Sequence, residues 1–119
     1  MKLVGSKTEQ DFREILIKSH NLLFEGNSFQ QLLPLLKSGF PDLKTVYIIN
    51  HIPEQGEDSY IVLVNLDIIA MIEINHNSQD ENAILETMNV NKFNKGMSKM
   101  EQIKLAVALD LAKNDINSN

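Results

Sequence analysis

The sequence contains no cysteine, which excludes disulfide bonds, thiolate catalysis and cysteine-based zinc sites. It also lacks an apolar segment of secretory length near its first residues, which read MKLVGSKTEQDF. The missing cysteines fit a reducing compartment, and the missing signal segment disfavours export. We therefore expect a cytoplasmic protein.

A long uninterrupted hydrophobic run is missing as well. The most apolar stretch, DSYIVLVNLDIIAMIEIN at 58–75, contains Asn65, Asp67 and Glu73. The apolar runs between these polar residues are too short to cross a bilayer, and charges within a span are costly. We expect no interaction with a membrane.

Motifs that carry known chemistry are equally scarce. No GxxxxGK[ST], GxGxxG or GxSxG pattern occurs in the chain. His51 and Glu54 stand at an HxxE spacing, but the intervening Pro53 disfavours the helix that would bring them together. The other two histidines are remote in sequence. We predict neither a metal site nor a cofactor.

What the chain does contain is the composition of an ordinary globular domain. It has 119 residues, of which 43% are apolar and 23% are charged. These values fit one domain spanning residues 1–119. Residues 114–119 are polar, and we expect them to fray.

The stretch at 58–75 predicts a β-hairpin. Its even-numbered positions from 60 to 74 are all apolar, and a period of two is typical of strands. A three-residue turn at Asn65–Asp67 pairs Val64 with Ile68 and keeps every even position on one face, whereas a two-residue turn would move Asp67 onto that face. We predict strands at 59–64 and 68–75, with Asp67 in the left-handed conformation.

Three helices are predicted around these strands. Pro34 lies inside the second one and predicts a kink or a division into two short turns. The last helix, which follows Gly96, has a broad apolar surface, which indicates burial against the sheet or a homodimer through this C-terminal helix. Each helix begins at a pair of the capping-box type: Thr8 with Asp11, Ser28 with Gln31, and Ser98 with Glu101.

Further strands complete the predicted sheet. KTVYIIN at 44–50 predicts a strand, 51–58 a polar loop, and 84–92 a weaker fourth strand. The resulting order is α-α-β-β-β-(β)-α. It predicts an α+β fold in which helices pack on one face of an antiparallel meander of three or four strands, with the hairpin at 59–75.

Charge is distributed unevenly along the chain. No lysine or arginine occurs from Thr45 to Asn91, whereas eight acids do, so this segment has a formal charge of −8. The remaining residues carry eleven cations and eight acids, which sum to +3 and leave the chain at −5. Such a field attracts a basic partner and disfavours nucleic acid.

The charge pattern predicts a non-enzymatic interaction module whose acidic surface binds a basic protein. Small acidic α+β domains of this layout are common among immunity proteins of toxin systems, and the analogy is one of architecture alone. A solvated surface that only aids solubility is the competing interpretation. The predicted partner-binding residues are Glu54, Glu57, Asp58, Asp80 and Glu81.

A small enzyme or ligand-binding domain is the alternative function. Glu73 follows the predicted hairpin, and Glu86 lies on the weaker fourth strand. With His51, they would form a carboxylate site between the sheet and the helices, where proximity and burial separate the pKa values of two acids.

Overall fold

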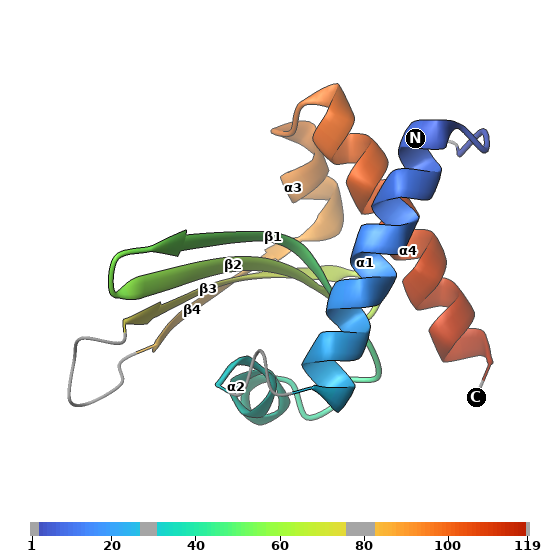
Figure 1. Cartoon of the computed structure of the whole chain (residues 1–119). Coiled ribbons are helices and arrows are strands. Elements are labelled where there is room, and N and C mark those ends of the chain that lie inside the picture. The colour runs from blue at the N-terminus through green and yellow to red at the C-terminus, as the bar shows by residue number, and fades with distance from the viewer. Residues whose placement is uncertain (1–2, 27–30, 76–82, 119) are drawn as a thin grey trace.

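The computed structural model describes residues 3–26, 31–75 and 83–118. It confirms the α+β architecture and the fourth strand, and it adds a short helix that follows that strand (Figure 1). Among the described residues, no helix has the length and apolar character that spanning a bilayer requires. The elements are α1 (Lys7–Glu25), α2 (Leu32–Gly39), β1 (Val46–Glu54), β2 (Glu57–Val64), β3 (Ile68–Asn75), β4 (Ala83–Asn89), α3 (Val90–Lys95) and α4 (Lys99–Asn117).

The four strands form an antiparallel meander in the order β1-β2-β3-β4. The predicted register of the β2–β3 hairpin is confirmed, since Val64 pairs with Ile68 and the pairing continues without a break along both strands. The predicted conformation of the turn is wrong in one residue. Asn65, with a φ of 55°, takes the left-handed conformation in place of Asp67.

The predicted loop at 51–58 is instead a second hairpin. β1 continues to Glu54, β2 begins at Glu57, and the two-residue turn between them places Gly56 at a φ of 82°. Pro53 is accommodated because β1 is an edge strand, where a missing N–H donor interrupts no pairing on the outer side.

β1 contains a bulge that changes which face its side chains occupy. Ile48 pairs with Val62, but Asn50 pairs with Ile61, so one residue of β1 is left over between the two pairs. Beyond that point the odd-numbered residues of β1, such as His51, lie on the face that its even-numbered residues occupy before the bulge.

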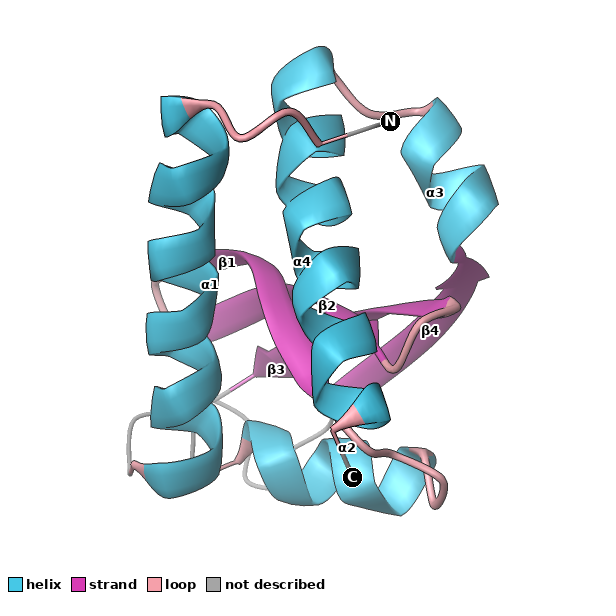
Figure 2. Ribbon diagram, turned by 90° about the vertical axis from the view of Figure 1, so that its right-hand side faces the viewer, coloured by secondary structure: helices cyan, strands magenta, loops and turns pink. Residues whose placement is uncertain are grey.

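The sheet has an apolar cluster on each face, so its helices are not confined to the single layer that we predicted (Figures 1 and 2). On the face here called the α2 face, α2 and the end of α1 cover Val62, Ala70 and Ile72. On the opposite face, called the α4 face, α1, α3 and α4 cover Leu63 and Ile69.

Helix α1 begins two residues before the predicted cap. Ser6 is the N-cap, and its Oγ accepts a hydrogen bond from the backbone N–H of Glu9 at 3.2 Å. The buried Glu9 carboxylate accepts in return from the backbone N–H groups of Val4 and Gly5. The capping box is therefore Ser6 with Glu9 rather than Thr8 with Asp11.

Helix α2 begins later than predicted. Ser28 lies outside the described residues, and the helix starts at Leu32 after Gln31. Pro34 is then the third residue of the helix, in the first turn, where an N–H has no partner within the helix. This position removes the reason for the predicted kink.

Helix α4 begins with the predicted capping box, since the Ser98 Oγ accepts from the N–H of Glu101 at 3.2 Å. It extends to Asn117, and fraying of residues 114–119 stays a prediction. Its last turns are held by Asp115, whose carboxylate accepts hydrogen bonds from the Thr45 hydroxyl at 2.9 Å and from the Tyr47 hydroxyl.

Candidate functional site

Among the residues that the structure describes, no helix covers the outer half of the sheet on its α4 face (Figure 1). Figure 1 shows that the β1–β2 hairpin and the paired ends of β3 and β4 extend well beyond α1 and α4. Apolar side chains are exposed there, with Ile52 46% and Ile84 55% accessible to solvent. We call this surface the open face; strand register assigns to it Asn50, Ile52, Glu54, Glu57, Ser59, Ile61, Met71, Glu73, Ile84 and Glu86.

Carboxylates border the apolar strip that Ile52, Ile61 and Met71 form on the open face, and Ile84 lies beyond Glu73 on the edge strand β4. Glu54 and Glu57 pair across the β1–β2 turn at its outer end. Glu73 pairs with Ile84, and Glu86 lies one pair further along β4, opposite Met71. All four glutamates are exposed. Because the strands lack any lysine or arginine, the open face combines an apolar floor with negative charge that no cation of the strands balances.

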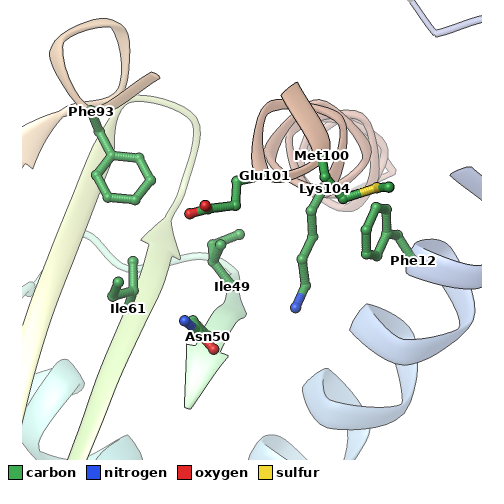
Figure 3. A pocket seen from close by; sticks show the side chains of 8 residues that line it. All are labelled: Phe12, Ile49, Asn50, Ile61, Phe93, Met100, Glu101 and Lys104. Carbon is green, nitrogen blue, oxygen red and sulfur yellow. The ribbon is translucent and has the colours of Figure 1, made fainter. Parts of the chain in front are cut away.

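Where the open face meets the helices there is a cavity of about 220 Å³, which we call the inner cavity (Figure 3). Two consecutive residues of β1, Ile49 and Asn50, both line it, as a bulge allows. A second hollow of about 190 Å³ lies further out along the sheet and shares Asn50 and Ile61 with the first. The hollows therefore adjoin. The remaining lining residues of the first are Phe12, Phe93, Met100, Glu101 and Lys104.

Lys104 brings a positive charge to this inner cavity. Its Nζ atom lies 5.8 Å from the centre of the Phe12 ring, a distance at which the ring face attracts a cation. Burial lowers the pKa of Lys104, and the nearby Glu101 charge opposes that shift in part. Among the described residues, Lys104 has no carboxylate within ion-pair distance.

The structure separates the three residues of the predicted catalytic site. Glu73 and Glu86 lie near each other on the open face, but the bulge places His51 on the opposite face with Tyr60. There the His51 Nε2 lies 2.8 Å from an oxygen of Asp58, and the ring stacks on Tyr60 at 4.3 Å. The three residues therefore do not form one site.

The predicted partner-binding acids are also divided. Glu54 and Glu57 lie on the open face, whereas Asp58 pairs with Pro53 and Ile74 on the α2 face. Asp80 and Glu81 lie outside the described residues. The acidic surface supported by the register therefore consists of Glu54, Glu57, Glu73 and Glu86.

A second polar cluster, which the sequence did not indicate, lies where α1 and α4 meet β1. The His20 Nδ1 lies 2.8 Å from the Val46 carbonyl, so this nitrogen carries a proton and donates it. The His20 ring stacks on Tyr47 at 4.6 Å. Burial, followed by the Asp115 carboxylate, raises the pKa of Tyr47 well above its usual range. These contacts join residues far apart in sequence, and no local motif marks them.

Helix α4 buries most of the apolar surface that suggested a homodimer. Leu105, Val107, Ala108 and Leu111 belong to the core on the α4 face. Met100, at the start of the helix, remains 55% exposed beside the inner cavity. A homodimer through this helix stays a prediction.

Comparisons with protein-family models, with curated proteins and with solved structures found no match to this chain. Within the described ranges, no group of three His, Asp or Glu side chains is placed to hold a metal ion.

Proposed function

We propose that this protein is a non-enzymatic interaction module whose open face binds a basic, amphipathic segment of another protein. One observation carries the proposal: half-exposed apolar side chains stand within a border of four glutamates on strands that have no cation. An acidic surface that served only solubility would have no need of a contiguous apolar strip such as Ile52, Ile61 and Met71.

The form of the partner follows from the backbone of the sheet. The main-chain groups of β2 and β3 are engaged on both sides by neighbouring strands, so the open face offers side chains rather than hydrogen-bonding backbone. A helix that lays an apolar stripe on the floor fits such a surface better than an added strand. Lysines or arginines beside that stripe would reach Glu73 and Glu86 on one side. On the other side they would reach Glu54 and Glu57, at the β1–β2 turn.

Catalysis by the two neighbouring carboxylates is less well supported. Glu73 and Glu86 are both exposed, and His51 lies across the sheet from them. The burial that enzymes use to tune a general acid or base is missing at this position. The open face therefore favours recognition over chemistry.

The proposal is tested with designed amphipathic helical peptides that carry the same apolar stripe and either lysine or glutamate on their flanks. Affinity for the intact protein is measured by calorimetry at low and moderate salt. We expect saturable binding of the lysine peptide alone, weakened by salt because exposed charge pairs are screened.

A matched pair of variants separates the open face from the overall charge. The test variant changes Glu54, Glu57, Glu73 and Glu86 to Gln. The control variant neutralises four exposed acids elsewhere, Glu14, Glu25, Asp42 and Asp67, and so has the same net charge. Exposed charge pairs contribute about 0.2–1 kcal/mol each, so the loss of four pairs should weaken binding by about 4-fold to about 1,000-fold. Equal loss in both variants would refute a defined site.

A further inference from the structure

The inner cavity adjoins the open face and has the chemistry of a site for a small ligand, formed without the four glutamates of that face. Its walls are largely apolar, from Phe12 on α1, Ile49 and Ile61 on the sheet, and Phe93 on α3. Lys104 extends from α4 into this apolar surrounding (Figure 3). A half-buried ammonium among aromatic and aliphatic groups has lost part of its hydration and gains most from a nearby anion.

The acid beside Lys104 is engaged elsewhere. The Glu101 carboxylate accepts a hydrogen bond from the Ser98 hydroxyl at 3.0 Å, as one half of the capping box of α4. In Figure 3 the Glu101 carboxylate points toward Phe93, whereas the Lys104 side chain extends away from it and its amine ends between Phe12 and Asn50. Because no carboxylate of the described ranges lies within ion-pair distance of the amine, it can accept the carboxylate of a ligand.

We propose that this cavity binds a short monocarboxylic acid with an apolar tail, the carboxylate resting on Lys104 and the tail lying among Phe12, Ile61 and Phe93. The Asn50 side-chain amide is the second donor available to the carboxylate. This binding goes beyond the proposed function and does not rest on it, because it uses the cavity lining rather than the glutamate border.

The charge and volume of the cavity select this class of ligand. A phosphate dianion requires more donors than one ammonium and one amide, and it would be repelled by Glu101 and by the open-face glutamates. The volume of about 220 Å³ is below the usual range of about 300–1,000 Å³ for ligand pockets. A short acid such as octanoate or phenylpropionate fits these limits.

The experiment titrates the full-length protein with octanoate and, in parallel, with octan-1-ol, while backbone amide NMR signals are recorded. We expect saturable shifts that centre on Ile49, Ile61 and Phe93 for octanoate, with affinity at least about tenfold weaker for the alcohol. Because this comparison uses the unmodified chain, it stands even if a variant fails to fold. Equal affinity for acid and alcohol, or no saturable binding of octanoate, would overturn the proposal.

Two variants test whether the Lys104 ammonium is the charge that binds octanoate. Lys104→Met keeps an unbranched apolar stem and removes the ammonium, and we expect it to lower octanoate affinity to that of the alcohol. Lys113→Met removes an exposed ammonium from the same helix and should leave octanoate affinity unchanged. Octanoate should also raise the pKa of Lys104, read from its side-chain carbon signal. Undiminished octanoate binding by Lys104→Met would contradict the assigned role.

Discussion

Asn65 should be the most sensitive polar residue of the β2–β3 turn. Its side-chain oxygen accepts hydrogen bonds from the backbone N–H groups of Lys44, at 2.8 Å, and Thr45, at 3.2 Å. Its side-chain amide donates to the Asp42 carbonyl at 3.1 Å. Its own backbone is left-handed, with a φ of 55°, which asparagine tolerates better than most residues. One side chain thus ties the chain segment that enters β1 to the turn that leaves β2.

The change Asn65→Ala removes all three side-chain bonds and leaves alanine in the left-handed region. These bonds lie near the surface, so each is worth about 0.5 kcal/mol, the lower end of the usual range, or about 1.5 kcal/mol together. The left-handed conformation costs alanine about 1 kcal/mol more. The expected loss in the free energy of unfolding is about 2.5 kcal/mol.

Urea denaturation followed by circular dichroism measures this loss. Asp67→Ala, in the same turn, is the matched control and should cost less than about 0.5 kcal/mol, as an exposed substitution usually does. Asn65→Asp keeps the acceptor for the two N–H groups and should recover part of the stability. Equal losses for Asn65→Ala and Asp67→Ala would refute the assignment of the turn to Asn65.

Three further outcomes follow from the packing and the pKa shifts. Leu63→Ala, at a fully buried position, should lower the free energy of unfolding by about 2–5 kcal/mol in urea titrations, whereas Ile15→Ala, 54% exposed, should change it little. Hydrogen bonding, chiefly from the Val4 N–H, lowers the pKa of Glu9 in the folded protein. The Glu9 carboxylate therefore stabilises the fold fully at a pH above its pKa in the unfolded chain, and this stabilisation is lost as the pH falls through its pKa in the folded chain. Glu9→Gln should make the free energy of unfolding less dependent on acid pH in denaturation curves. Glu101→Gln keeps the cap but removes the charge that supports the Lys104 ammonium, so NMR titration should show a still lower pKa for Lys104.

The hairpin register was predictable because burial leaves only one solution. Every even position from 60 to 74 is apolar, and a slip by one residue would expose that set and bury Asp67. The α4 cap was predictable for a similar reason, since Ser98 and Glu101 are three residues apart in sequence and satisfy each other locally. In both cases the deciding interactions are short in range.

The turn residue was harder to predict because two candidates flank Leu66. Asparagine and aspartate both tolerate a left-handed backbone. Asn65 takes it because its side chain also reaches Lys44 and Thr45, about twenty residues earlier in the chain. That contact exists only once β1 has paired with β2, and nothing in the turn itself indicates it.

The candidate sites were predicted only in part. Open-face acids were visible as a charge pattern, but assigning them to a face required the complete pairing of the sheet. Lys104 gave no signal, because a lysine between Ile103 and Leu105 looks like any polar position on an amphipathic helix. Its environment arises from α1, α3 and the sheet, which converge only in the folded chain.

The β1 bulge connects these observations physically. Without the extra residue, strict alternation would place Ile52 and Glu54 on the same side as Ile48, toward α2, and His51 on the opposite side. With it, Ile49 and Asn50 both turn toward the α4 face and together line the inner cavity. The same shift carries Ile52 and Glu54 onto the open face. One inserted residue in an edge strand therefore shapes the wall of the cavity and completes the acidic border beside it, which is why neither surface could be assigned from alternation alone.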